Sequence, residues 1–279
     1  MRQILMTALW FSIPSLAVYA QPDLETVSVR ADTLATECVI QLDGRSEESC
    51  WAGAPVHIVK HEQRPHPGSA PLVGTRYRIV QDTDNLYVFV ECDEQNPENL
   101  RYVWGRRDKV LSDQDSISVY IDPIGTRTFA QLFRTNPVGS VTDGTFSEAS
   151  LTQSLDQDFE FEVATRIHES GWTAEFKIPF RSLRYGGAKA GAAWTMLVTR
   201  NYPRNDRYVY ASAPIVQNSD CFLCKNPQLV GLMPPDSPRY LSVTPYFLGR
   251  KIKQRLDRAR TDSSDTEIGV DLKVRLGAS

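Results

Sequence analysis

The sequence predicts an all-β fold, an antiparallel β-sandwich followed by a short β-rich C-terminal extension. From Gly74 onward the chain contains short runs in which apolar residues alternate with other residues, at the period of two expected for strands. Turn-forming residues separate these runs. No helix-length segments alternate with the strands, and this spacing favours an antiparallel sandwich over a parallel α/β sheet.

The first strands are expected to form a hairpin. Residues 76–80 read Arg-Tyr-Arg-Ile-Val and residues 86–90 read Leu-Tyr-Val-Phe-Val, with the turn-rich segment 82–85 between them. Two apolar-alternating runs around such a turn are a good hairpin signal. Only residues 47–51 and 96–103 are typical of brief helical turns.

The body of the chain continues in the same manner. Residues 171–178 are the clearest strand, because apolar and polar side chains alternate throughout, and Pro179 then ends regular pairing. A short turn is expected at 181–184. The remaining predicted strands are 116–122, with Ile117, Val119 and Ile121 on one face, 128–134, 159–167, with Phe159, Phe161 and Val163 inward, 194–199 and 208–210. Trp51, Trp172 and Trp194 are expected in the core, where aromatic side chains are usually buried.

The C-terminal forty residues contain two more alternating runs, at 240–247 and 268–276. The connector between them, residues 250–260 and a Thr/Asp/Ser loop, is too charged to be core. Two strands with a polar connector bury too little surface to form a domain. These strands therefore either join the preceding body or open a further part that this chain lacks.

The N-terminal twenty residues have the layout of a secretory signal. A short positive start, Met1-Arg2, precedes an apolar run broken by Pro14, and small residues stand at 18–20. The alternative is an uncleaved anchor. Residues 21–36 are interpreted as a linker, and the working compartment is expected to lie outside the cytoplasm.

Overall charge and hydropathy exclude some classes of partner. The chain has 31 Lys and Arg against 34 Asp and Glu, so it has no basic footprint for nucleic acid. No later segment approaches eighteen consecutive apolar residues, so no membrane-spanning helix is expected.

The cysteines fit an oxidising compartment. Cys221-Phe-Leu-Cys224 is expected to close as a local disulfide, with a metal knuckle as the alternative. A zinc site would need a second ligand pair, and the only candidate, His57 and His61, shares its segment with prolines. Cys38 and Cys50 could bridge across a short loop, which would leave Cys92 as a buried thiol, and the odd number of cysteines leaves the pairing open.

No hydrolase motif is present. The chain lacks a G-x-S-x-G elbow, an H-E-x-x-H helix and a phosphate-binding glycine loop. Carboxylates are plentiful, so residue type alone does not exclude a two-acid glycosidase site, which needs two carboxyls about 5–10 Å apart. Most of these acids are interpreted as solvated strand faces and turns, and the chain is predicted not to be an enzyme.

Five motifs, in order along residues 37–232, resemble those of family 9 carbohydrate-binding modules. They are Leu-Asp-Gly-Arg-Ser-Glu-Glu at 42–48 followed by Trp51, Asp-Asn-Leu-Tyr-Val-Phe-Val at 84–90, Asp-Gln-Asp-Ser-Ile at 113–117 with Asp122, Ala-Gln-Leu-Phe-Arg-Thr-Asn at 130–136, and Gly-Trp-Thr-Ala-Glu at 171–175 with Ile-Pro-Phe at 178–180. The resemblance implies a non-catalytic, saccharide-binding sandwich of jelly-roll, immunoglobulin-like type over residues 37–239.

The C-terminal strands carry a second resemblance. Thr-Pro-Tyr at 244–246 and Gly-Val-Asp-Leu-Lys at 269–273 are similar to segments of bacterial proteins that carry this module ahead of an outer-membrane β-barrel of unassigned function. The likeness implies that residues 240–279 are the opening strands of an incomplete barrel. It also implies an exported protein of the periplasm or outer membrane of a Gram-negative bacterium.

The family resemblance implies the contacts to a sugar. Arg134 stands in the strand whose arginine reaches the saccharide, and Asn218 stands in a second binding segment. The family's two stacking tryptophans are absent: Leu111-Ser112 occupies one position, and near the other only Phe222 offers a ring. Trp104, if its loop folds back, and Asp115 complete the candidate carbohydrate-binding residues. Ser118 replaces a glutamate of the family.

Calcium is a possible structural ion. Asp43, with Glu47 and Glu48, could contribute oxygen ligands, as could Asp113 and Asp122. The alternatives are a simple turn at Asp43-Gly44, and ion pairs of the other aspartates, Asp115 included, with Arg106 and Arg107.

The leading hypothesis is an exported carbohydrate-binding module whose partners are a saccharide and an outer-membrane barrel. One alternative is a periplasmic interaction or plug domain of a barrel protein, without affinity for sugar. Another is an accessory domain of a glycoside hydrolase system that takes part in carbohydrate catabolism.

Overall fold

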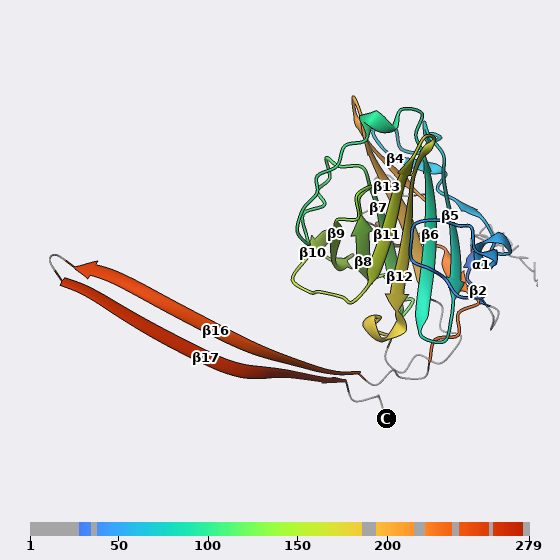
Figure 1. The fold of residues 1–279 in the computed structure, drawn as a ribbon. Helices are drawn as coiled ribbons and strands as arrows, with labels where there is room; N and C mark the ends of the chain where they lie inside the picture. The colour runs from blue at the N-terminus through green and yellow to red at the C-terminus, as the bar shows by residue number, and fades with distance from the viewer. Residues whose placement is uncertain are drawn as a thin grey trace, which may run out of the picture.

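In the computed structural model, two β-sheets pack face to face (Figure 1). The structure describes residues 28–34, 38–185, 194–214, 221–235, 240–256 and 259–275. In these residues strands dominate, and helical turns are limited to three short elements: α1 (Ser49–Ala52), η1 (Pro97–Asn99) and η2 (Phe180–Ser182). The predicted all-β sandwich is confirmed.

The larger sheet combines strands from both ends and the middle of residues 28–230. Its strands lie in the order β1 (Ser28–Arg30), β15 (Gln228–Val230), β13 (Thr195–Pro203), β7 (Ser116–Asp122), β8 (Phe129–Thr135), β9 (Val141–Ser147) and β10 (Thr152–Ser154). β14 (Arg207–Ala211) also pairs with β13, and β4 (His61–Arg64) pairs with β14. All of these pairings are antiparallel except that of β1 with β15.

The smaller sheet covers one face of the larger one. Its order is β11 (Glu162–His168), β12 (Gly171–Pro179), β6 (Asn85–Asp93), β5 (Thr75–Gln81) and β2 (Asp32–Thr33), and β3 (His57–Ile58) also pairs with β5. The predicted hairpin of residues 76–90 is β5 and β6, with Asp82 accepting hydrogen bonds from the backbone N–H groups of Asp84 and Asn85 in the turn.

The main core lies between the two sheets and follows the predicted alternation. Ile117, Val119 and Ile121 of β7 are completely buried, and so are Trp172 and the other apolar residues of β12. Trp194 belongs to the same cluster, whereas Trp51 packs in a smaller cluster on the outer face of the smaller sheet, 5.4 Å from the ring centre of Phe89. All three tryptophans are buried, as predicted.

One strand begins later than predicted. β11 starts at Glu162, although Phe159 is buried and Phe161 packs against the core. The backbone N–H of Phe159 donates to the buried carboxylate of Asp143. A side chain thus satisfies this backbone group, and the segment does not extend the sheet at that point.

The C-terminal residues form a separate two-stranded sheet, β16 (Tyr240–Leu256) and β17 (Ala259–Arg275) (Figure 1). The predicted polar connector at 250–260 is wrong, because pairing continues to the end of the hairpin at Leu256 and Ala259. A two-stranded ribbon buries neither face in a core, so charged residues do not prevent pairing. Within the described part of the chain, no helix has the length and hydropathy needed to cross a membrane.

Candidate functional site

A pocket of about 460 Å³ lies on the outer face of the larger sheet, the face turned away from the smaller sheet. This volume is within the range of small-ligand sites, about 300–1,000 Å³. Its described lining consists of Gln63, Arg64, Ser112, Ser116, Ser118, Tyr120, Arg134, Phe146, Leu151, Gln153, Thr199, Asn201, Arg207, Val209, Cys221 and Phe222.

Strand register builds the floor of the pocket. Because Ile117 and Val119 point into the core, the alternate residues of β7 point outward. Ser118 stands opposite Arg134 of β8 on one side and opposite Thr199 of β13 on the other. One face of three neighbouring strands therefore presents a row of polar side chains.

Arg134 is held in place by neutral groups. Its Nε donates to Ser118 Oγ at 2.8 Å, and its Nη2 donates to Gln153 Oε1 at 3.2 Å. The amide nitrogen of Gln153 in turn donates to the hydroxyl of Tyr120 at 2.8 Å. Gln153 lies on β10, and this chain of hydrogen bonds fixes the guanidinium at the pocket wall.

Aromatic rings form the other half of the pocket. The Phe222 ring centre lies 5.1 Å from that of Tyr120 and 4.7 Å from that of Phe146, and the Tyr120 and Phe222 rings meet edge to face. Tyr120 and Phe146 belong to a small apolar cluster on this outer face of the sheet. The pocket thus lies where an apolar region of the sheet face borders a polar one.

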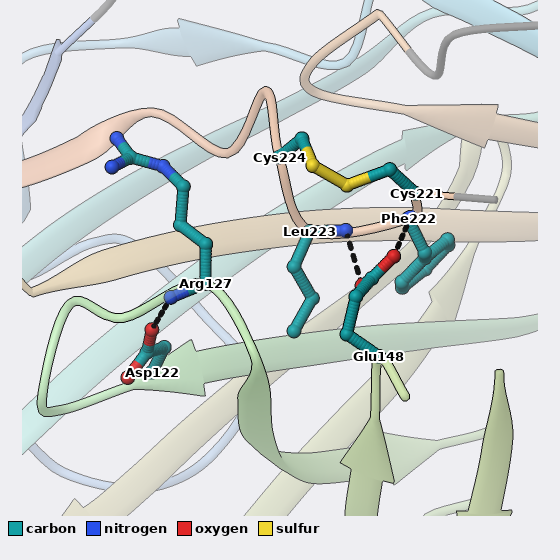
Figure 2. The surroundings of a disulfide bond; sticks show 7 residues. All are labelled: Asp122, Arg127, Glu148, Cys221, Phe222, Leu223 and Cys224. Atoms are coloured by element: carbon teal, nitrogen blue, oxygen red, sulfur yellow. Dashed lines mark hydrogen bonds between the residues drawn. A yellow bond between two sulfur atoms is a disulfide. The ribbon is translucent and has the colours of Figure 1, made fainter. Parts of the chain in front are cut away.

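A clamp fixes the loop that carries Phe222. The two carboxylate oxygens of Glu148 accept hydrogen bonds from the backbone N–H groups of Phe222 and Leu223, the latter at 2.9 Å (Figure 2). A disulfide between Cys221 and Cys224 closes the same loop. The Phe222 ring is therefore positioned by contacts to its own backbone as well as by ring packing.

Two further arginines stand at the rim. Arg207 of β14 donates from Nη1 to Ser112 Oγ at 3.0 Å, and Asn201 donates from Nδ2 to the backbone carbonyl of Ser112 at 2.8 Å. Arg64 of β4 is paired with Val209, which is two residues from Arg207 on the same strand. Arg64 and Arg207 therefore share this face of the sheet as diagonal neighbours.

The structure brings together some of the predicted saccharide contacts. Arg134 and Phe222 both line the pocket, whereas Asn218 lies outside the described residues. Trp104 is 70% exposed and is not part of the pocket lining. Asp115 is completely buried elsewhere, where Arg204 donates to its carboxylate and the backbone N–H of Arg101 does the same.

Sequence reasoning did not identify several groups in the pocket. Tyr120, Gln153, Asn201 and Arg207 line it together with Arg134. For Tyr120 a signal was available, because it alternates with core residues of β7 and must face outward. The others depend on register between strands that are distant in the sequence.

The acidic residues considered for calcium do not converge. Asp122 accepts hydrogen bonds from the backbone N–H groups of its own turn, Asp43 accepts one from Arg45, and Asp113 is exposed. In the described ranges, no group of three or more Asp, Glu, His or Cys side chains is placed to hold a metal ion. Asp113, Asp115 and Asp122 do not pair with Arg107 either. The ion-pair partners of Arg107 are two other aspartates, Asp143 and Asp158.

The other cysteines also have defined positions. Cys38 and Cys50 are joined by a disulfide, and Cys92 is a free, buried thiol. Burial raises the pKa of Cys92 to about 12, so this thiol is protonated and unreactive at neutral pH.

The pocket suits a polar ligand that also has an apolar face. Aromatic edges and faces can contact C–H groups, while the fixed hydroxyl, amide and guanidinium groups can bond hydroxyls. In the described lining there is no carboxylate and no imidazole.

Comparisons with known proteins identify the family and show which solved structures have a similar fold. A family model described as carbohydrate family 9 binding domain-like matches residues 42–209. A family 9 module from Caldicellulosiruptor kristjanssonii in complex with glucose is 13% identical, with a TM-score of 0.51 over 76% of this chain and 100% of the module. The cellotriose complex of such a module from this organism is 14% identical, with a TM-score of 0.50 over 74% of this chain and 95% of that one.

A third solved structure is a Bacteroides uniformis protein with a proposed role in carbohydrate binding. It is 12% identical, with a TM-score of 0.57 over 73% of this chain and 98% of that protein. At such identities these structures establish the fold. Among curated proteins, no sequence is similar enough to this chain to count as a match.

Proposed function

Because this chain belongs to the carbohydrate family 9 binding domain-like family, we propose that it is a non-catalytic module that binds saccharide in the pocket on its larger sheet. Solved modules of similar fold hold glucose and cellotriose. Arg134 and Phe222 are proposed as central contacts, and Asn218 is retained as a proposed contact on the family resemblance alone.

The observation that carries this proposal is the position of Arg134. Its guanidinium is held by Ser118 and Gln153 next to the rings of Tyr120 and Phe222. A pyranose needs both features, since one of its faces is largely C–H and its edge carries hydroxyls. The proposed binding mode is therefore ring contact on one side and charge-assisted hydrogen bonds on the other.

A non-catalytic role agrees with the chemistry of the pocket. Glycoside hydrolysis uses two carboxyl groups across the cleft, one as an acid and one as a base or nucleophile. The described lining supplies neither.

Calorimetric titration of the full chain with mono- and oligosaccharides tests the proposal. We expect binding of at least one saccharide, weakened about ten- to a hundredfold by Arg134→Ala, because bonds to a charged group are lost. Arg166→Ala, on an exposed position of β11 in the other sheet, is the matched control. No heat with any saccharide would leave the alternative of an interaction domain without sugar affinity.

The C-terminal hairpin supports a more specific proposal about location. On one face of β16 and β17, Val243, Pro245 and Phe247 stand opposite Leu272, Val270 and Ile268, and all six are exposed. On the other face the cross-strand pairs are mainly polar, such as Thr244 with Asp271. Tyr246 covers Gly269 there and donates to Glu267.

We propose on this basis that the module is exported and belongs to an outer-membrane β-barrel of a Gram-negative bacterium. Barrel strands present apolar side chains to lipid and polar ones to the lumen, and this hairpin likewise has one apolar and one mainly polar face. Two strands cannot close a barrel, so the hairpin would enter the membrane by pairing with the strands of a barrel already present in the outer membrane. The two disulfides, Cys38–Cys50 and Cys221–Cys224, are consistent with an oxidising compartment outside the cytoplasm.

Fractionation of a Gram-negative host that expresses the chain tests this location. We expect the protein in the outer-membrane fraction, and less of it there when Val270 is replaced by Lys, because a charge facing lipid costs about 2–4 kcal/mol. Thr244→Lys, on the polar face, is the matched control. Equal, soluble recovery of all three proteins from the periplasm would remove the proposed membrane role and leave saccharide binding untouched.

A further inference from the structure

The charge of the pocket differs from the charge of the chain as a whole. The chain carries a formal net charge of −3, with 34 acidic and 31 basic residues. The pocket is lined by Arg64, Arg134 and Arg207, and among the described lining residues there is no acid. Three cations thus converge on one cavity.

These arginines lack the carboxylate partners that several other arginines of the protein have. Arg78 and Arg204, for example, form ion pairs with carboxylates at 2.8 Å. Arg134 instead bonds the neutral groups of Ser118 and Gln153. In the described part of the chain, none of the three pocket arginines lies within 4.0 Å of a carboxylate oxygen.

The strand register keeps the rim charges close together. Arg64 and Arg207 are diagonal neighbours across β4 and β14, about 7–8 Å apart at such positions and within reach of long side chains. Like charges brought together without a counter-charge repel one another. A ligand anion would remove this repulsion, and arginine binds carboxylate and sulfate groups through paired N–H donors.

We infer that the ligand is an acidic saccharide, one whose carboxylate or sulfate lies between the rim arginines Arg64 and Arg207 while its ring contacts the aromatic side. This inference rests on the proposed saccharide function and adds the chemical class of the sugar. Arg134 bonds the ring hydroxyls, and the rim arginines select for the negative group. The serine at position 118 fits this selection, because a carboxylate there would repel the anion.

Titration of the full chain with sugars matched in all but the acidic group tests the inference. The probes are glucose against glucuronate and glucose 6-sulfate, galactose against galacturonate, and inorganic sulfate alone. We expect an acidic member to bind at least about tenfold more tightly than its neutral counterpart, as a charge-assisted contact would give. This preference should shrink between about 20 mM and about 500 mM NaCl, because salt screens exposed charges.

Variants assign the preference to the rim. Arg64→Gln and Arg207→Gln should each reduce acidic-sugar affinity about ten- to a hundredfold and neutral-sugar affinity far less, while Arg64→Lys should keep part of the preference. Both rim residues are exposed, so folding should be retained. Arg166→Gln removes the same charge from the opposite sheet and should change neither affinity.

The outcomes separate the two proposals. Neutral sugars that bind as tightly as acidic ones, in an Arg134-dependent manner, would overturn the acidic class and keep the saccharide function. Inorganic sulfate that binds as tightly as the acidic sugars would overturn the role of the sugar ring. Failure of every sugar to bind would overturn both.

Discussion

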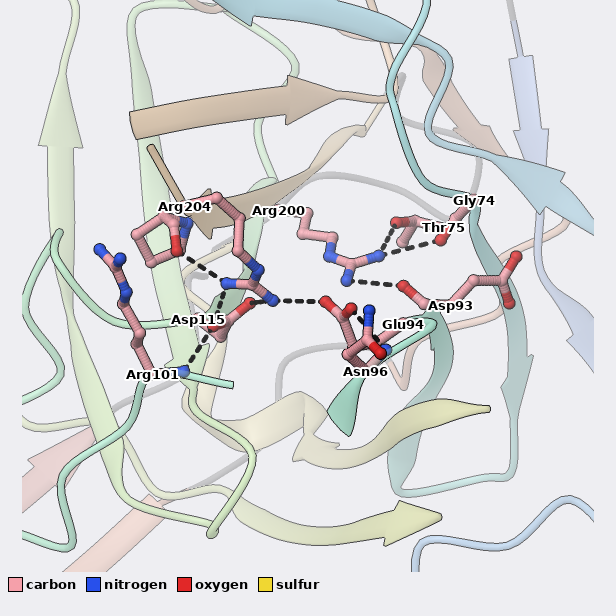
Figure 3. A network of polar contacts seen from close by, with 10 residues as sticks. Gly74, Thr75, Asp93, Glu94, Asn96, Arg101, Asp115, Arg200 and Arg204 are labelled. Carbon is pink, nitrogen blue, oxygen red and sulfur yellow. Dashed lines mark hydrogen bonds and ion pairs between the residues drawn. The ribbon is translucent and has the colours of Figure 1, made fainter. Parts of the chain in front are cut away.

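Two groups of arginines, one between the sheets and one on the outer face, differ in their partners. In the interior, Arg204 forms ion pairs with the carboxylates of Glu94 and Asp115, and Arg200 donates to the backbone carbonyls of Gly74 and Asp93 (Figure 3). In the pocket, Arg134 has only neutral side-chain partners among the described residues.

The difference follows from solvation. A charge removed from water must be paired or hydrogen-bonded, so the interior arginines pair with carboxylates or donate to backbone carbonyls. A charge at an open pocket keeps contact with water and can remain without a carboxylate. The number of arginines therefore says little about a binding site. The burial of each guanidinium, taken together with its partners, distinguishes structural arginines from those available to a ligand.

The largest expected effect comes from removing the interior ion pairs of Arg204. Arg204→Met should lower the free energy of unfolding by about 3–5 kcal/mol, because Asp115 is completely buried and would lose its counter-ion. Chemical denaturation at neutral pH measures this loss. The double variant Arg204→Met with Asp115→Asn should recover part of it, since the charge of Asp115 is gone and only that of Glu94 remains unpaired. A loss below about 1 kcal/mol would contradict a structural role for this arginine.

Glu175 is the reverse case, a completely buried carboxylate without a cation. One of its oxygens accepts from the backbone N–H groups of Asp43 and Gly44, and the other has no partner. Burial raises the pKa of Glu175 from 4.5 to about 7, although these two hydrogen bonds act in the opposite direction. The folded protein therefore binds this proton more tightly than the unfolded chain does.

The resulting pH dependence is the second prediction. The stabilisation is fully present below pH 4.5 and is lost as the pH rises through 7, by up to about 3 kcal/mol. Denaturation across this window, with a chelator present, should show a greater loss of stability in the wild type than in Glu175→Gln, because the other groups with shifted pKa values, such as Asp143 and His57, titrate in both proteins. Equal slopes in the two proteins would refute the assignment, and a slope abolished by added calcium would instead identify a cation site at Asp43 and Glu175.

Glu148 offers a third test, because this carboxylate supports the pocket without touching an arginine. Glu148→Gln keeps one acceptor for the two backbone N–H groups of the Phe222 loop. Saccharide affinity should fall about tenfold, and the free energy of unfolding by about 1–2 kcal/mol. Calorimetry and denaturation measure the two quantities. Glu162→Gln, which removes an exposed partner of Lys177, is the control and should affect neither.

How much of this structure can be predicted from the sequence depends on how far apart in the chain the interacting residues lie. The strand of 116–122 and the inward face of 171–178 follow from local alternation, and both agree with the structure. Arg134 was found through its motif. The rim pair Arg64 and Arg207 was not, because it depends on the pairing of β4 with β14, and no local pattern encodes that register.

The hairpin shows a second limit. Charged residues at 250–260 indicated a loop, yet the strands pair through them. Polarity predicts which residues avoid a core, and it predicts pairing only where one face of a sheet must be buried. The Glu148 clamp illustrates a third limit, since its acceptor and donors are more than seventy residues apart and the donors are backbone groups.

The smallest expected effect completes the comparison between the two groups of arginines. Arg64→Gln and Arg207→Gln, alone or together, should change the free energy of unfolding by no more than about 0.5 kcal/mol, as for other exposed positions. At low salt the free energy of unfolding should stay the same or rise slightly, because each substitution removes one of several like charges from the cavity. Added salt should remove this gain. Denaturation at two ionic strengths measures this. A loss above about 1 kcal/mol would place these arginines with Arg204 as structural groups, and their unpaired charge would then no longer argue for an acidic ligand.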